Sequence, residues 1–239
     1  MAAGAKVNSS ALEGAIKQKY DDVYFETVLK AAELGDPKAC FQVSVAYLIG
    51  QGMDADEAKS FEFCRRAVDG GYKAAFYSLA RHFFYGIGTE KRVKEATYYS
   101  QIGYNETRSF DCGLLLAKCY QEMKQPEAGF ELYLEMAENG SRDAQFITSH
   151  CYLEGNGVTP NHFFYLKWIR KAASSGHLEA QVELGKRLFR GDGIPMDREL
   201  GLELITNASK RKYIPAVRAL EEITKGTKSF WSELLSNFR

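Results

Sequence analysis

Small and bulky apolar residues recur along this chain every 36 or so residues, and their spacing within each unit is helical. A small residue opens a helical run at Ala39, Ala75, Ala144, Ala180 and Ala216. The intervals are 36 (75−39), 69 (144−75), 36 (180−144) and 36 (216−180), and the long one contains an irregular unit that starts near Cys112. Bulky residues follow four and eight positions later, on the same face of an α-helix. A period of this size predicts an all-α solenoid of stacked helix pairs.

Each unit is predicted to form a first helix, a glycine turn and a second helix. The expected helices cover 37–49 and 54–68, 73–84 and 91–102, 109–123 and 125–139, 142–153 and 161–174, 178–190 and 197–209, and 214–224. The turns contain Gly50 and Gly52, Gly86 and Gly88, Gly155 and Gly157, and Gly191 and Gly193. Glycine at these positions allows the positive φ that ends a helix and reverses the chain. The irregular unit has QEMKQPEAG instead, which predicts a shorter hairpin.

Columns of equivalent residues indicate which positions pack. The first helices have a second small column, five residues after the first, at Ser44, Ala80, Ala117, Ser149 and Gly185. The second helices have a small column at Ser60, Ala96, Gly129 and Gly201, which Tyr165 interrupts. Small residues let helices approach closely, so we expect these columns to lie between helices.

The two ends are expected to act as caps. We assign 1–10 to a disordered lead, 11–34 to an N-terminal capping helix, and 35–226 to five units plus a partial sixth. Residues 227–239 predict an amphipathic C-terminal capping helix, because Phe230, Trp231, Leu234, Leu235 and Phe238 share one helical face. The alternative for this last helix is docking onto a partner or a second copy, which would make a dimer.

The repeat resembles a known family, the Sel1-like repeat, a relative of the tetratricopeptide repeat. The stretch GNGVTPNHFFYLKWIRKAASSG (155–176) matches the family pattern closely, and the resemblance covers about 31–225. It implies a right-handed solenoid of antiparallel helix pairs whose first helices line a concave face. It also implies a role as an adaptor, an assembly factor or a signalling scaffold. Some bacterial members resemble immunity proteins that neutralise a toxin, and a secretion-linked chaperone is a further alternative.

Charge and composition exclude some partners. The 31 Lys and Arg residues balance the 31 Asp and Glu residues, so nothing favours nucleic acid or an anionic membrane. No apolar run approaches the roughly 20 residues that span a bilayer. Five cysteines without a CxxC pair predict reduced, buried thiols and a cytoplasmic protein, or a periplasmic one if a signal peptide was trimmed.

The face of each first helix opposite the packing columns is the predicted partner-binding stripe. Its residues vary between units while the packing columns stay alike. In a solenoid, the regular positions stack the repeats and the variable positions are free to bind a partner. The stripe consists of Gln42, Val45, Ile49, Arg81, His82, Tyr85, Leu115, Lys118, Ile147, His150, Glu154, Lys186, Arg187 and Arg190. We predict that it forms a groove for a partner protein, presented as a mixed or acidic peptide segment or as a folded domain. The alternative is an ordinary solvated face.

The cysteines offer two further kinds of chemistry, metal binding and disulfide formation. His82, Cys119 and Cys151 share one column, but packed helices lie about 8–10 Å apart, whereas zinc needs ligand atoms at about 2.0–2.3 Å. Packed or free thiols are therefore expected, and no metal or cofactor. Some secreted Sel1-like proteins carry a disulfide between the regions of Cys40 and Cys64. Their second cysteine would match Val68, so we expect free thiols here.

No catalytic pattern is present: the chain contains no HExxH, GxSxG or phosphate-binding GxxxxGK[ST]. We therefore predict a non-enzymatic protein-interaction module. The less favoured alternative is an enzyme or a small-ligand binder with a site in the groove, which would need acid, base or metal groups that converge on one spot.

Overall fold

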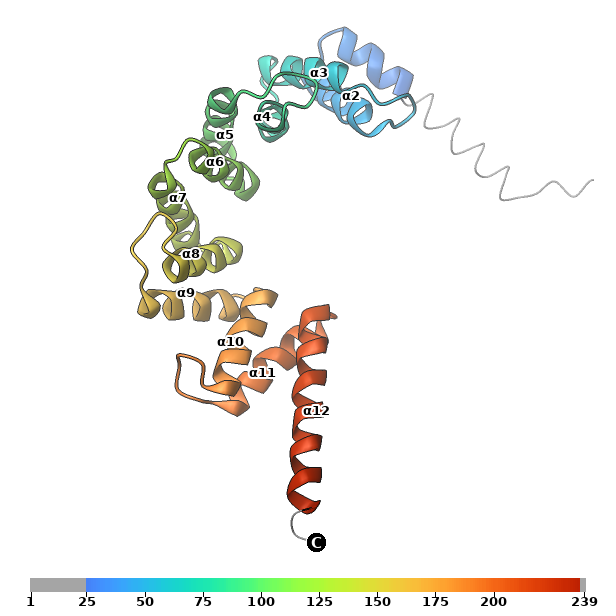
Figure 1. Cartoon of the computed structure of the whole chain (residues 1–239). Helices are drawn as coiled ribbons and strands as arrows, with labels where there is room; N and C mark the ends of the chain where they lie inside the picture. The colour runs from blue at the N-terminus through green and yellow to red at the C-terminus, as the bar shows by residue number, and fades with distance from the viewer. Residues whose placement is uncertain (1–24, 237–239) are drawn as a thin grey trace, which may run out of the picture. The chain divides into compact units, whose positions relative to one another are not determined.

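The computed structural model describes residues 25–236, with side chains as far as 225, and every regular element in that part is helical (Figure 1). The chain divides into two compact units, Met1–Lys124 and Gln125–Arg239. Among the described residues, none of the helices combines the length and the apolar character that crossing a bilayer requires. The lead at 1–10 and most of the N-terminal capping helix lie outside the described residues, as do the side chains of the C-terminal cap.

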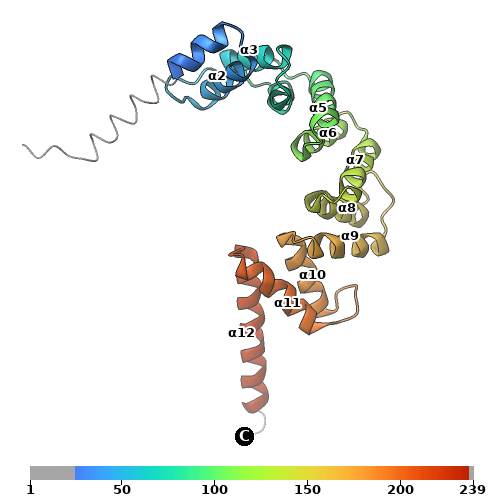
Figure 2. The ribbon, with the colours of Figure 1, turned by 180° about the vertical axis from the view of Figure 1, so that it is seen from behind.

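The first unit contains two complete helix pairs and the first helix of a third. Residues 25–33 are helical and precede α2 (Pro37–Ile49) and α3 (Glu57–Asp69). A short 3-10 turn, Lys73–Ala75, leads into α4 (Phe76–Tyr85), which is followed by α5 (Val93–Thr107) and α6 (Phe110–Glu122). Packing joins α2 with α3 and α4 with α5, and α6 packs on both α4 and α5. Figure 2 shows α2 and α3 side by side from behind.

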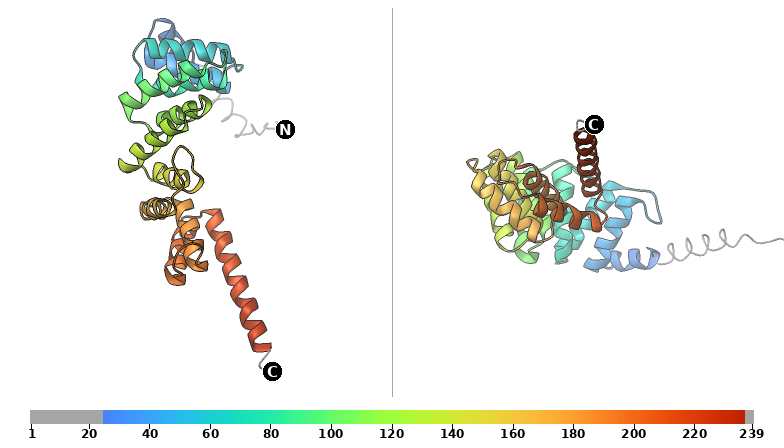
Figure 3. Two further views of the ribbon diagram at one scale, coloured as in Figure 1. Left: turned by 60° about the vertical axis from the view of Figure 1, so that its left-hand side comes forward. Right: turned by 90° about the horizontal axis from the view of Figure 1, so that it is seen from below.

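The second unit continues the alternation. It consists of α7 (Pro126–Glu138), α8 (Arg142–Glu154), α9 (His162–Ser174), α10 (Leu178–Arg190), α11 (Arg198–Lys210) and α12 (Ile214–Ser236). The helix α12 packs on α10 and α11, and its backbone then continues beyond both (Figure 3). We call α2, α4, α6, α8, α10 and α12 the first helices of their repeats, and the others the second helices.

Local sequence explains where the helices begin and end. The Asp36 carboxylate accepts a hydrogen bond from the Ala39 amide at 2.6 Å, and Pro37 occupies the first helical position of α2. Gly50 ends the helix with a φ of 68°. The same devices bound α10, which His177 caps and Gly191 ends. The predicted bounds of α2 and α10 are therefore correct.

Two expected helix ends are wrong because a glycine does not always end a helix. The helix α5 was expected to stop at residue 102, before Gly103, but it continues to Thr107. A Cβ on Gly103 would lie 2.8 Å from the Cys112 sulfur, so this glycine serves close packing against α6. The segments 214–224 and 227–239 were expected to be separate, yet one helix covers Ile214–Ser236. A single interior glycine costs a helix only about 1 kcal/mol.

The predicted packing columns form the core. The opening small residues Ala39, Ala75, Cys112, Ala144, Ala180 and Ala216 are all at most 5% exposed. Close backbone approach explains the need for small side chains. A Cβ on Gly185 in α10 would lie 2.8 Å from the Gly201 carbonyl oxygen in α11. The assignment of these columns to helix interfaces is confirmed.

In two of the turns the second glycine has a role beyond the turn itself. A Cβ on Gly88 would overlap the Glu57 carbonyl, and one on Gly157 would overlap the Pro126 carbonyl. Glu57 and Pro126 are the first residues of α3 and α7, the second helices of the preceding repeats. The loop therefore stacks one repeat on the one before it within each unit, and its glycine leaves room for this contact.

Candidate protein-binding site

The predicted stripe is exposed only in part, because the His82 position faces the preceding repeat and Leu115 is buried in the core of the first unit. His82 is 2% exposed and Leu115 is 3% exposed, so the expectation that both lie on a free surface is wrong. The His82 Nδ1–H donates to the Ile87 carbonyl at 2.7 Å, and its Nε2 lies 3.3 Å from the Ser60 hydroxyl of α3. Burial lowers the pKa of His82. This histidine is a neutral contact between repeats.

The residues equivalent to His82 in three other repeats are also buried, namely Ala46, Cys119 and Cys151, whereas Arg187 in α10 is half-buried. All five cysteines of the chain are free and buried, and burial raises the pKa of the Cys64 thiol to about 12. Among the described residues, no group of three histidine, cysteine or carboxylate side chains is placed to hold a metal ion.

What remains of the stripe in the first unit is here called the α2–α6 face. It consists of Gln42, Val45, Ile49, Arg81, Tyr85 and Lys118. Gln42, Ile49, Tyr85 and Lys118 are exposed, whereas Val45 and Arg81 are half-buried.

An apolar pocket of about 250 Å³ lies at the N-terminal end of this face. Its lining comes from α2 and its loop and from the helical residues 25–33, and consists of Phe25, Val28, Phe41, Gln42, Val45, Ala46 and Gln51. Sequence reasoning placed Gln42 and Val45 on the predicted stripe but did not predict the pocket. It missed Phe25, Val28 and Phe41 as pocket residues, because hydrophobic spacing within a helix does not show that two helices leave a gap.

The two cations of the α2–α6 face are not ion-paired with any described residue. Within the part of the chain that the structure describes, neither Arg81 nor Lys118 forms an ion pair. The Arg81 guanidinium lies 5.8 Å from the centre of the Tyr77 ring. By contrast, Lys91 is paired with Glu122 at 2.8 Å. The face therefore presents two available positive charges.

The stripe in the second unit, here called the α8–α10 face, consists of Ile147, His150, Glu154, Lys186, Arg187 and Arg190. Ile147, His150, Lys186 and Arg187 are half-buried there, whereas Glu154 and Arg190 are exposed.

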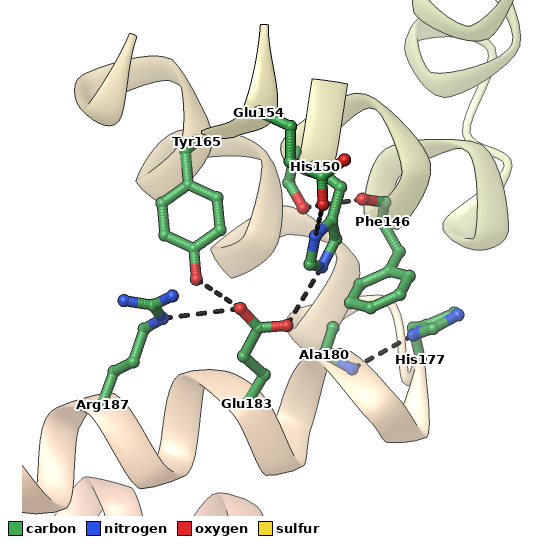
Figure 4. A network of polar contacts seen from close by, with 9 residues as sticks. Phe146, His150, Glu154, Tyr165, His177, Ala180, Glu183 and Arg187 are labelled. Atoms are coloured by element: carbon green, nitrogen blue, oxygen red, sulfur yellow. Dashed lines mark hydrogen bonds and ion pairs between the residues drawn. The ribbon is translucent and has the colours of Figure 1, made fainter. Parts of the chain in front are cut away.

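A polar network fixes part of this second face, and Glu183 of α10 is at its centre (Figure 4). The Glu183 carboxylate lies 3.0 Å from Nε2 of His150 in α8 and accepts a 2.8 Å hydrogen bond from the Tyr165 hydroxyl in α9. The Arg187 Nε lies 3.4 Å from the same carboxylate, as an ion pair. One carboxylate thus joins three helices.

The pKa shifts in this network follow from the contacts. Burial opposes ionisation of Glu183, but the hydrogen bonds with His150 and Tyr165 outweigh it and lower the pKa of the carboxyl. The hydrogen bond with Glu183 raises the pKa of His150. Burial, reinforced by Glu183, raises the pKa of Tyr165. An ionised carboxylate surrounded by donors clamps helices together and is poorly suited to give or take a proton.

Aromatic rings hold the histidine of the network in place. The His150 ring lies 4.6 Å from the Phe146 ring, which stacks on His177 at 4.4 Å. His177 in turn accepts a hydrogen bond from the Ala180 amide at the start of α10. Arg187 lies over the Tyr165 ring at 4.9 Å. Sequence reasoning missed the roles of Phe146, His177 and Tyr165, although Tyr165 interrupts a column of small residues and so gave a signal.

Comparison with known proteins agrees with this architecture. At 26% identity over 219 residues, the chain resembles chitin synthase regulatory factor 3 of Schizosaccharomyces pombe, covering 85% of this chain and 23% of that protein. It is 27% identical over 162 residues to an exopolysaccharide production negative regulator of Rhizobium meliloti, covering 61% and 59% of the two chains. The chain thus spans less than two thirds of the length of either relative.

A solved structure shares the fold. The antigen c5321 of uropathogenic Escherichia coli, which displays an SLR fold, aligns with a TM-score of 0.65 at 22% identity, over 80% of this chain and 41% of that one. The Sel1 repeat model matches 37–72, 74–105, 115–141, 142–177 and 178–213. The third match is shorter than the others, as expected from its missing glycine turn. With five matches over most of its length, the chain belongs to the Sel1 repeat family.

Proposed function

We propose that this chain is a non-enzymatic protein-interaction module, an adaptor or scaffold that holds a partner segment on its first helices. One observation carries the proposal: the packing columns are buried and alike, whereas the remaining exposed positions of the first helices differ from repeat to repeat. A repeat array needs its regular positions for stacking, so specificity has to come from the others. Exposed Tyr85 and half-buried Arg81 are of the types that most often dominate interface energy.

The relatives support a role in regulation. Two of them, from a yeast and a bacterium, are named as regulators of chitin synthase and of exopolysaccharide production. A regulatory protein that lacks a set of catalytic residues acts by binding another protein. We extend to this chain only that mode of action, because both relatives are longer proteins.

Affinity capture with matched variants tests the proposal. Wild-type chain and the variants Arg81→Ala and Tyr85→Ala would be used to retain partners from the source organism, followed by affinity measurement on the retained protein. Each variant should weaken binding by about 2 kcal/mol or more, the usual threshold for a hot spot. Tyr98→Ala is the matched control, because Tyr98 is similarly exposed but lies on the second helix α5.

The Tyr98→Ala control also defines the result that would contradict the proposal. Binding that survives Arg81→Ala and Tyr85→Ala but is lost in Tyr98→Ala would place the interface on the second helices. Circular dichroism melting of every variant separates loss of binding from loss of fold.

A further inference from the structure

We infer that the α2–α6 face binds a peptide segment that carries one large apolar side chain beside acidic residues. The apolar side chain would enter the pocket at α2, and the acidic residues would meet Arg81 and Lys118. The inference rests on the proposed function and specifies the chemistry of the partner.

The pocket selects for an apolar group. Among the residues that the structure describes, its lining contains no ionisable side chain, and the amides of Gln42 and Gln51 are the polar side-chain groups. A charged group placed there would lose its hydration without gaining an opposite charge, which disfavours a charged side chain. The volume of about 250 Å³ is below the roughly 300–1,000 Å³ of pockets that take drug-sized ligands. It therefore suits one large side chain that projects from a peptide.

The cations follow the pocket in a regular row. Val45, Arg81 and Lys118 occupy the same helical position in α2, α4 and α6, at intervals of 36 (81−45) and 37 (118−81) residues. The row is apolar where it lines the pocket and cationic in the next two repeats. Neither Arg81 nor Lys118 forms an ion pair with a residue that the structure describes. Cations in a row that are not held in ion pairs attract carboxylates and disfavour a basic partner.

The environment of Arg81 favours a carboxylate as its ligand. Its guanidinium lies over the Tyr77 ring at 5.8 Å. An arginine positioned in this way keeps its planar N–H donors for a bidentate contact, which matches a carboxylate. Exposed Tyr85 lies one turn further along α4 and can cover the peptide backbone. Nucleic acid also carries anions but brings no aliphatic anchor for the pocket, and its binding is therefore an outcome that the test must exclude.

A selection experiment on the full chain tests the inference. A random peptide library displayed on phage is selected on immobilised wild-type chain, and the enriched peptides are synthesised and measured by fluorescence anisotropy. We expect enriched sequences with a Leu, Met, Phe or Trp next to Asp or Glu. The variants Val45→Glu and Val45→Phe, which place charge in the pocket or fill it, should each weaken binding at least about tenfold. Arg81→Glu with Lys118→Glu should turn the selection toward basic peptides.

The controls make each result decisive. Ala58→Glu adds the same charge at an exposed position of α3 and should leave binding unchanged. The inference is wrong if no peptide is enriched, if the enriched peptides lack either feature, or if both Val45 variants bind normally. It is also wrong if a single-stranded DNA oligonucleotide displaces the selected peptides. If binding is instead lost only with Lys186→Glu and Arg190→Glu on the α8–α10 face, this inference fails while the proposed function stands.

Discussion

Removal of the Glu183 carboxylate should destabilise the second unit strongly, because this group joins α8, α9 and α10. The variant Glu183→Ala loses the hydrogen bonds with His150 and Tyr165 and the ion pair with Arg187. A hydrogen bond to a charged group contributes about 1.5–3 kcal/mol, but neighbouring bonds are not additive. The side chain of Glu183 is 23% exposed, so water replaces part of what is lost. We therefore expect a loss of about 2–4 kcal/mol in the free energy of unfolding.

The conservative variant Glu183→Gln should cost less, because the amide oxygen still accepts a hydrogen bond from Tyr165. We expect about 1–2 kcal/mol. Glu179→Ala is the matched control, since Glu179 is exposed one turn earlier on α10. Exposed positions of this kind usually change stability by no more than about 0.5 kcal/mol.

The contribution of the network should depend on pH in a defined direction. The pKa of Glu183 is lowered by folding, so its contribution is present above the unfolded value of about 4.3 and is lost as pH falls through the folded pKa. The pKa of His150 is raised by folding, so its contribution is complete below about pH 6.5 and is lost as pH rises through the folded pKa. The difference in stability between wild type and Glu183→Gln should therefore be smaller at about pH 8.5 than at about pH 6.

Urea unfolding followed by tryptophan fluorescence in a Trp231→Phe background is the appropriate assay, because the remaining Trp168 is buried in α9 and reports on this unit. Repeat arrays can unfold in parts, so a local probe is preferable to a global one. The reasoning is refuted if Glu183→Ala unfolds within about 0.5 kcal/mol of the Glu179→Ala control. A Glu183→Gln difference that is equal at both pH values would refute the assignment of His150 as the titrating partner.

Two further predictions concern the loops and the thiols. Gly88→Ala should cost about 2 kcal/mol more than Gly71→Ala in chemical denaturation, because both glycines have positive φ but only Gly88 has the Glu57 carbonyl where a Cβ would lie; equal losses would mean that the loop does not stack on α3. In the native chain the five buried thiols should react slowly with iodoacetamide at about pH 8, since burial raises the pKa of Cys64 to about 12 and that of Cys151 to about 11, and all should react after unfolding in urea. Fast native labelling would contradict this.

The sequence by itself determined the repeat, the two helices of each repeat and the interface between the helices of each pair. These features depend on local signals. Asp36 and Pro37 start a helix, Gly50 ends one, and small residues such as Ala180 recur where backbones meet. Each signal acts within a few residues or repeats at a fixed period, so a single chain is enough to show it.

Only the tertiary structure decided which positions of the first helices stay free. Helical periodicity places His82 opposite the core of its own pair, but it does not show that α3 of the preceding repeat covers that side. The same limit hid the pocket beside Val45 and the carboxylate of Glu183 between three helices. The spacing of residues along one helix specifies its faces, whereas the position of the next helix depends on loop contacts and side-chain volumes from distant parts of the chain.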